Sequence, residues 1–200
     1  MNTSAGNEEH EAYTNRLVRL SGSRLKTILN VQAPYRWNIR RRIEGFVLDV
    51  GCGIGRNLEH LGGTGVGVDV NPLSVAEAQQ RGLTAFTLSG FASSEYAVEN
   101  RFDSLLIAHV LEHMEPHEAS ALVSSYLPYV KSGGAVVVIC PQQRGYASDE
   151  THVNYLTADG IKEILRPLGL IITRSYSFPF PTFVGRIFTH NETIVLARKP

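Results

Sequence analysis

The chain has 200 residues, of which 43% are hydrophobic, and its 19 lysines and arginines balance 19 aspartates and glutamates. This composition fits one globular domain with a single core, and zero net charge provides no field to attract nucleic acid. No apolar run approaches the roughly 20 residues that span a bilayer. The chain has only two cysteines, Cys52 and Cys140, whereas a disulfide framework or a cysteine metal cluster needs more of them at short spacings. We expect a cytoplasmic monomer or homodimer with neither a nucleic-acid partner nor a membrane span.

The first 45 residues precede the first expected strand. Residues 1–12 are polar and lack periodicity, which predicts a disordered tail. Residues 13–45 predict a helical extension or lid, because apolar residues recur at helical spacing before the chain turns through Pro34 and exposes aromatic side chains. Residues 46–200 remain for the main domain.

From residue 46 onward, apolar strands alternate with helices. The strands are expected at 46–50, 66–70, 84–88, 104–108, 135–140, 170–176 and 192–197. Helices are expected around Asn57, from Pro72 to Arg81 after an Asn71 cap, at 116–127, and from Thr157 to Gly169. This order predicts an α/β fold with a mostly parallel sheet and helices on both faces, which binds ligands beyond the carboxyl ends of its strands.

A glycine-rich loop follows the first strand directly. Gly51, Gly53 and Gly55 stand two residues apart before a helix, where the backbone must turn sharply and a ligand can approach it. Twenty residues after Asp49, the second strand ends at Asp69, which is placed to accept hydrogen bonds from ribose hydroxyls. The dinucleotide pattern requires a sixth-position glycine, but Arg56 stands there, so a pyrophosphate cradle is disfavoured.

At this point the sequence resembles the class I S-adenosylmethionine-dependent methyltransferases. The matching stretches are Val47 to Gly55, Gly67 to Asn71, Phe102-Asp103, His109 to His113, and the turn from Lys131 to Gly134. The resemblance implies a Rossmann-like methyltransferase fold over residues 46–200, with seven strands of which the last is antiparallel. It also implies S-adenosylmethionine as the cofactor.

Carried over by position, the resemblance implies cofactor contacts from loops that follow four strands. The residues concerned are Asp49, Gly51, Cys52, Gly53, Gly55, Asn57, Asp69, Val70, Ser89, Gly90, Ala108, His109 and His113. Many relatives have an aspartate where this chain has Ser89 and Gly90, so the adenine contact departs from the family pattern. Glu112 and His113 equally suit helix capping or hydrogen bonding in the core.

The polar segment 141–155 follows the fifth strand and is expected to receive the methyl acceptor. Asp149 and His152 are three residues apart, so the carboxylate can orient an imidazole that removes a proton near neutral pH. We assign His152 as general base, with Asp149 and His109 as further catalytic candidates. Alternatively, Asp149 caps a turn and His152 packs beneath the loop. A divalent cation held by Asp149, His152 and Glu112 is a third interpretation, but the spacing does not support it and no metal site is assigned.

The acceptor is expected to be a saccharide or a similar small polar metabolite that is methylated on a hydroxyl. The loop and the segment 178–181 resemble small methyltransferases of glycan and glycolipid assembly, among them the 1-O-methyltransferase of methylmannose polysaccharide synthesis, which implies a role in polysaccharide biosynthesis. Tyr35, Trp37, Phe178 and Phe180 either wall a sugar pocket or pack in the core. The alternatives are a nitrogen, carbon, quinone or lipid acceptor, a nicotinamide-dependent oxidoreductase, and a non-catalytic cofactor-binding subunit.

Overall fold

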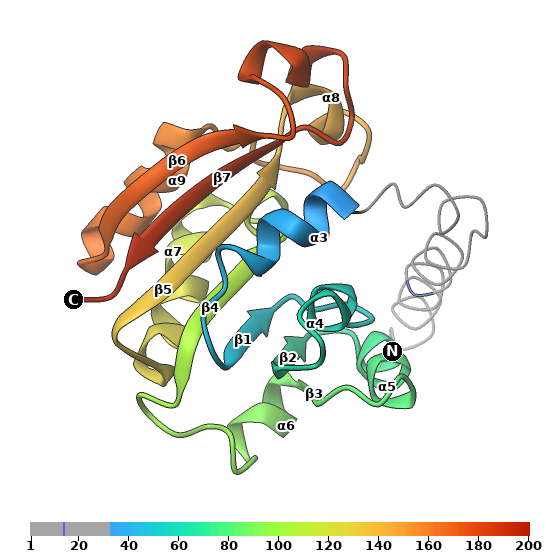
Figure 1. The fold of residues 1–200 in the computed structure, drawn as a ribbon, viewed down its shortest axis with the longest axis vertical. Coiled ribbons are helices and arrows are strands. Elements are labelled where there is room, and N and C mark those ends of the chain that lie inside the picture. Colours follow the sequence, from blue (N-terminus) through green and yellow to red (C-terminus); the bar gives the residue numbers. More distant parts are fainter. Residues whose placement is uncertain (1–13, 15–32) are drawn as a thin grey trace, which may run out of the picture.

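The computed structural model describes Thr14 and residues 33–200. The expected tail, and the extension up to residue 32 apart from Thr14, lie outside the described residues. A seven-stranded sheet in the order β3-β2-β1-β4-β5-β7-β6 forms the centre of the molecule (Figure 1). None of the helices in the described part has both the length and the apolar character needed to cross a bilayer.

Seven strands and seven α-helices follow one another along residues 33–200. The strands are β1 (Val47–Val50), β2 (Gly65–Asp69), β3 (Ala85–Thr87), β4 (Phe102–Ala108), β5 (Val130–Pro141), β6 (Ile171–Phe178) and β7 (Glu192–Arg198). The helices are α3 (Ala33–Arg40), α4 (Arg56–His60), α5 (Pro72–Gln80), α6 (Leu88–Ala92), α7 (Pro116–Tyr126), α8 (Gln143–Tyr146) and α9 (Ala158–Leu165). Short 3-10 turns include η1 (Leu111–His113) and η4 (Thr182–Arg186).

Strands β1 to β5 are parallel to one another, and β7 runs antiparallel between β5 and β6. This confirms the expected fold class, including the antiparallel last strand. Because the carboxyl ends of β1, β2 and β4 lie at one edge, the loops that follow them meet there. The antiparallel direction of β7 brings its first residue, Glu192, opposite Pro141 at the end of β5.

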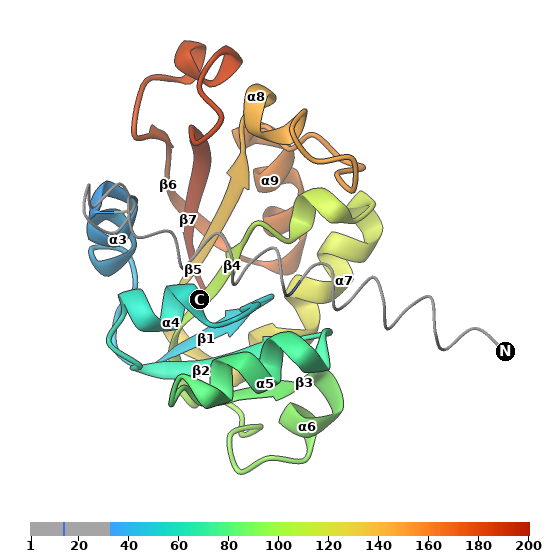
Figure 2. The same cartoon turned by 90° about the vertical axis from the view of Figure 1, so that its right-hand side faces the viewer.

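Two apolar layers hold the helices against the sheet, as expected for a sheet that is covered on both faces. Helices α6, α7 and α9 cover one face through Phe91, Val123 and Ile161, and α3 and α4 cover the other through Ile39 and Leu58. Figure 2 shows the two sets of helices on opposite sides. Burying both faces explains why the strands are nearly continuous apolar runs rather than alternating ones.

Two local expectations were wrong. Residues 33–40 form helix α3 and not a turn, because Pro34 is the second residue of the helix, where its missing N–H costs no hydrogen bond. The segment after β3 forms helix α6, whose start is capped by the Thr87 hydroxyl accepting from the N–H of Gly90. The caps at Asn71 and Thr157 were predicted correctly.

Candidate active site

The glycine loop after β1 has the sharply turned backbone that its sequence predicts. Gly51, Gly53 and Gly55 have φ angles of 76°, 52° and 80°, a region that L residues with side chains rarely adopt. A Cβ on Gly51 would overlap the side chain of Val110, which follows β4. The N–H groups of Gly51 and Cys52 both donate to the carbonyl of Val68 in β2. The loop is therefore fixed between two strand ends.

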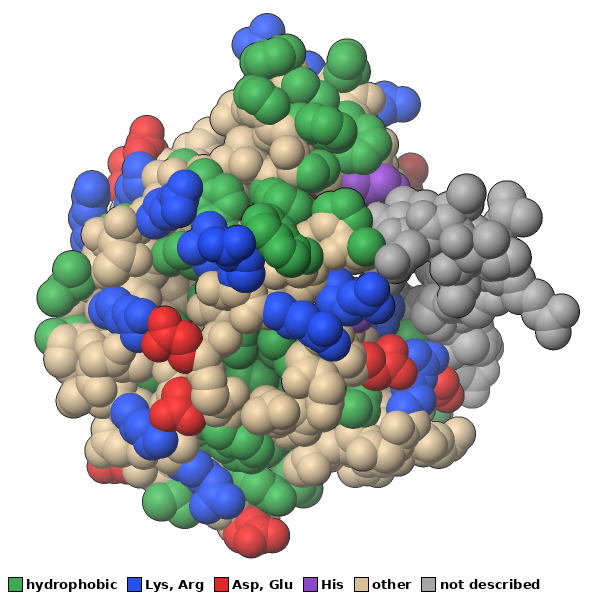
Figure 3. Space-filling view, viewed as in Figure 1, with side chains coloured by type: hydrophobic (Ala, Val, Ile, Leu, Met, Phe, Trp, Pro, Cys, Tyr) green, Lys and Arg blue, Asp and Glu red, His purple; other side chains and the backbone are tan. Residues whose placement is uncertain are grey.

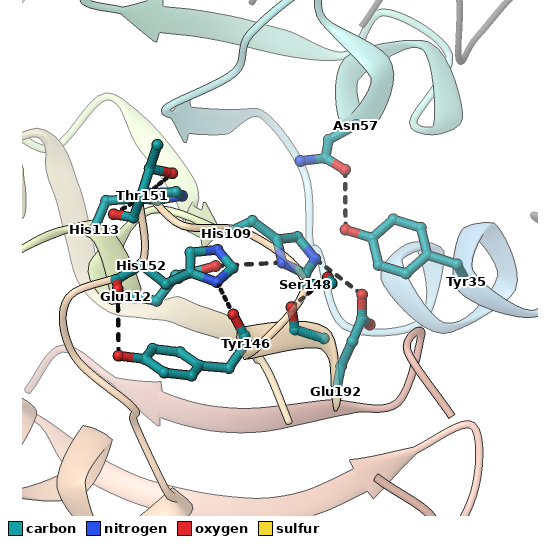
Figure 4. Close-up of polar contacts among 11 residues, drawn as sticks. Tyr35, Asn57, His109, Glu112, His113, Tyr146, Ser148, Thr151, His152 and Glu192 are labelled. Carbon is teal, nitrogen blue, oxygen red and sulfur yellow. Dashed lines mark hydrogen bonds and ion pairs between the residues drawn. The ribbon is translucent and has the colours of Figure 1, made fainter. Parts of the chain in front are cut away.

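Asp49 lies fully buried in β1, directly before this loop. Its Oδ1 accepts a hydrogen bond from Asn57 at 3.4 Å. Figure 4 shows that Asn57 in turn accepts one from the hydroxyl of Tyr35, at 3.2 Å. Burial raises the pKa of Asp49 to about 7 and outweighs the opposing effect of the Asn57 hydrogen bond. Among the described residues, nothing donates to its Oδ2. This buried oxygen suits a cationic ligand group.

Asp69 ends β2 and connects the glycine loop to the next helix. Its carboxylate accepts from the N–H of Gly53 at 2.7 Å and from the N–H of Asn71 at 2.8 Å. Asn71 caps helix α5 and also donates to the hydroxyl of Thr14. Next to Asp69, the side chain of Val70 is 67% exposed. The strand end thus offers a carboxylate beside an open apolar surface.

Not all the cofactor residues expected from the resemblance lie where their side chains can face a ligand. Cys52 packs in a core cluster with Val75 and Ala78 of α5, so only its backbone belongs to the loop surface. Ala108 is buried at the end of β4, against the helix-α3 side of the core. Ser89 and Gly90 lie in the first turn of α6, one residue beyond the exposed side chain of Leu88.

His109 follows β4 in a left-handed conformation, with φ of 59°, and its ring lies between two carboxyl groups. Its Nε2 is 2.9 Å from Oε1 of Glu192, and its Nδ1 is 3.4 Å from Oε1 of Glu112 (Figure 4). Desolvation of the ring lowers the pKa of His109, but the hydrogen bond to Glu192 and the charges of both glutamates outweigh it and raise the pKa to about 10. At neutral pH His109 is therefore an imidazolium and cannot accept a proton.

The expected acceptor loop is the segment 141–155, which contains Asp149 and His152. The Asp149 carboxylate accepts hydrogen bonds from the N–H and the hydroxyl of Thr151, and Nδ1 of His152 is 2.7 Å from the carbonyl of Tyr146. The Tyr146 carbonyl therefore holds the His152 ring through Nδ1, and the Asp149 carboxylate caps the turn at Thr151, as in the alternative considered from the sequence. A carbonyl can only accept, so His152 carries its proton on Nδ1 and keeps the lone pair on Nε2.

Two chain segments bring Glu112, His113 and His152 together. Glu112 and His113 end the turn η1, and the N–H groups of Val153 and Asn154 donate to the Glu112 carbonyl at 2.9 and 3.1 Å. The rings of His113 and His152 have centroids 4.6 Å apart. The structure thus brings together His113 and His152, two histidines considered in the sequence analysis, near the end of β4.

The sequence did not identify two residues, Glu192 and Tyr35, as part of the hydrogen-bonded site. Glu192 was expected only as the first residue of a strand, and an acidic residue opening an apolar strand is a weak signal. Tyr35 was considered only as a pocket wall or core residue, whereas its hydroxyl bonds with Asn57. Trp37 is 54% exposed and Phe180 is 47% exposed, while Phe178 packs on the core beside α3.

Comparison with known proteins agrees with this geometry. Residues 47–134 match the model of a family described as a methyltransferase domain. No curated protein matches the chain. The solved structures that share its fold include an S-adenosylmethionine-dependent methyltransferase from Archaeoglobus fulgidus, with 19% identity, a TM-score of 0.64, and 82% of this chain and 93% of that chain covered.

Two further structures match over almost the whole length. Magnesium protoporphyrin IX methyltransferase from Synechocystis PCC 6803, solved with S-adenosylhomocysteine, has 17% identity and a TM-score of 0.67, with all of both chains covered. A complex of a methyltransferase with its activator from Haloferax volcanii has 16% identity and a TM-score of 0.66, with 96% of this chain and 98% of that chain covered.

The fold is therefore that of the Rossmann-like class I methyltransferases. Residues 47–134 of this fold also match a methyltransferase domain, and the solved structures that share the fold include S-adenosylmethionine-dependent methyltransferases.

Proposed function

We propose that this protein transfers the methyl group of S-adenosylmethionine to a hydroxyl of a saccharide or another small polar acceptor. The observation that carries the proposal is the pair of buried carboxyl groups, Asp49 and Asp69, on either side of the glycine loop. A ligand that carries a positive charge and hydroxyl groups can then contact Asp49 at the end of β1 and Asp69 at the end of β2. When bound, the cofactor supplies a methyl group activated by its sulfonium sulfur.

Each part of the cofactor has a suitable partner at the strand ends. Asp49 offers its Oδ2 to the ammonium of the methionine part, close to the N–H groups of the glycine loop. Asp69 suits the ribose hydroxyls, because a carboxylate can accept further hydrogen bonds in addition to those from Gly53 and Asn71. Val70 and Leu88 directly follow the paired residues Asp69 and Thr87 of β2 and β3, and both are exposed enough to cover the faces of the adenine.

The acceptor would lie between the end of β4 and the acceptor loop. His152 is the best-placed general base, because Tyr146 holds its Nδ1 proton and its Nε2 lone pair can accept one from the hydroxyl during attack. His109 is reassigned to a positioning role, since it is already protonated. Its imidazolium lies between the carboxyl groups of Glu112 and Glu192, and so connects the end of β4 to the start of β7.

A lipid or quinone acceptor is the variant that a specific observation favours. Figure 3 shows apolar side chains gathered over the connection between β6 and β7. Phe183 and Ile187 are 71% and 80% exposed there, and Phe180 and Phe188 lie next to them. No comparable feature of residues 33–200 favours a nitrogen or carbon acceptor, an oxidoreductase or a non-catalytic cofactor-binding subunit.

Calorimetric titration with S-adenosylhomocysteine tests the proposal. We expect micromolar affinity, reduced about tenfold or more by Asp69→Asn, because a charged hydrogen-bond acceptor for the ribose is lost. Asp159→Asn, on the exposed surface of α9, is the matched control and should leave the affinity unchanged. Saturable binding of NADH instead would reject the proposal.

Turnover then separates an enzyme from a cofactor-binding subunit. Purified protein would be incubated with S-adenosylmethionine and panels of saccharides, amines and quinones, and the methylated products detected by mass spectrometry. Products from sugars that disappear with His152→Ala support the O-methyltransferase. Products from amines or quinones alone would redirect the acceptor.

A further inference from the structure

A second polar cluster lies at the turn after β4 and includes His113, which the resemblance places among the cofactor contacts. Glu112, His113 and His152 each offer one ligand atom, and these three atoms lie within 4.8 Å of one another. Two imidazoles and one carboxylate are a ligand set typical of divalent transition metals such as zinc and iron. The cluster differs from the cation site considered from the sequence, because His113 takes the place of Asp149.

Both histidines are oriented as metal ligands usually are. Nδ1 of His152 is 2.7 Å from the carbonyl of Tyr146, and Nδ1 of His113 is 3.2 Å from the carbonyl of Thr151. Since carbonyl oxygens only accept, both rings carry the proton on Nδ1 and leave the Nε2 lone pair available. Such a carbonyl partner fixes the tautomer and orientation of histidines that bind metal.

Glu112 gives an independent indication that a positive ligand is missing. Its side chain is completely buried, and neither carboxylate oxygen has a hydrogen-bond partner among the described residues. One oxygen makes an ion pair with His109 at 3.4 Å, but the same ring is shared with Glu192, whose Oε2 likewise has no hydrogen-bond partner in the described part. Two buried carboxyl groups thus share one imidazole ring, and the unpartnered oxygens of Glu112 are left for a further positive ligand.

The three ligands come from segments that are already fixed together. Glu112 and His113 belong to the turn η1, which follows β4 of the sheet. The loop that carries His152 is joined to that turn by hydrogen bonds from Val153 and Asn154 to the Glu112 carbonyl. Binding an ion would therefore require only side-chain adjustment.

We propose that Glu112, His113 and His152 bind a divalent first-row transition metal ion, for which Zn²⁺ is the probe. The metal site itself does not depend on the proposed methyl transfer. Its use does rest on that function: an ion there would lower the pKa of an acceptor hydroxyl bound to it, and so replace His152 as the group that promotes deprotonation.

Metal binding is tested on tag-free protein stripped with a chelator. Calorimetric titration with Zn²⁺ and visible absorption during titration with Co²⁺ should each show one equivalent bound. His113→Ala and His152→Ala should each weaken Zn²⁺ binding more than tenfold, whereas His117→Ala, an exposed histidine on α7, should not. Excess Mg²⁺, which prefers oxygen ligands, should not displace Zn²⁺.

The buried ligand needs a variant that preserves its shape. Glu112→Gln keeps the side-chain volume and should also weaken Zn²⁺ binding, while circular dichroism and S-adenosylhomocysteine binding show that the variant is folded. No saturable binding by the wild type, or wild-type Zn²⁺ affinity in both alanine variants, would overturn the metal site. Because cofactor binding depends on Asp69, the loss of either binding activity alone shows which proposal has failed.

Discussion

Nε2 of His109 lies 2.9 Å from Oε1 of Glu192, a residue 83 positions later in the chain. The contact joins the end of β4 to the start of β7. The protonation state of His109 therefore depends on Glu192 of β7, a strand that lies outside the sequence motifs of the cofactor site.

Replacing His109 should destabilise the protein. His109→Asn tolerates the left-handed backbone but removes the cation between Glu112 and Glu192. We expect the free energy of unfolding to fall by about 1–3 kcal/mol, less than for a fully buried pair because 42% of the His109 side chain is exposed. Urea denaturation at pH 6 measures this change, with His117→Asn as the control. An unchanged free energy would show that the pair contributes nothing.

The same contact predicts a pH dependence. The folded pKa of His109, about 10, lies above the unfolded value near 6.5, so its contribution to stability is complete below about pH 6.5 and is lost as the pH rises through 10. The difference in unfolding free energy between wild type and His109→Asn should therefore shrink between pH 6 and pH 10. A constant difference would contradict the raised pKa.

Asp49 predicts the opposite trend. Its folded pKa of about 7 lies above its unfolded value near 3.9, so burial of the charged form reduces stability progressively as the pH rises from about 4 to 7. Relative to the wild type, Asp49→Asn should therefore gain about 2–4 kcal/mol in stability between pH 4 and pH 8. Urea denaturation at both pH values checks this, with the exposed Asp159→Asn as control. The variant should bind S-adenosylhomocysteine more weakly.

Gly51 and Gly82 form a matched pair for the glycine loop. Their φ angles are 76° and 77°, but a Cβ on Gly51 overlaps Val110, whereas a Cβ on Gly82 meets open space. We expect Gly51→Ala to cost about 1–3 kcal/mol more than Gly82→Ala, because only the first variant adds a steric clash to the backbone strain. Thermal or urea unfolding measures both, and Val110→Ala should partly rescue Gly51→Ala. Equal costs would exclude the clash.

Tyr35 predicts an effect on ligand affinity. Tyr35→Phe removes its hydrogen bond to Asn57, the residue that also bonds with Asp49. We expect a loss of about 0.5–1.5 kcal/mol in binding S-adenosylhomocysteine, or roughly two- to tenfold in Kd. Trp37→Phe, on the same helix but exposed, is the control for calorimetry. If both variants bind equally well, helix α3 does not support the cofactor loop.

The glycine loop, the position of Asp69 at the end of β2 and the Asn71 cap could be predicted from the sequence, because their signals are local. A glycine loop, an acidic residue twenty positions later and an Asn-Pro helix start each depend on neighbouring residues. The contacts around His109 and His152 could not be predicted, because they join separate segments. The pairing of His109 with Glu192 depends on how β7 enters the sheet, and the orientation of His152 depends on a backbone carbonyl, which no residue type reveals.

The position of β7 between β5 and β6 also sets an order in which the site can be completed during synthesis. The cofactor loop, its carboxylates and their helices all precede residue 134, so the surface for the cofactor can form while the rest of the chain is still being made. Glu192 arrives last and must insert between two strands that are already present in the chain. Until then, His109 lacks its nearest carboxyl partner.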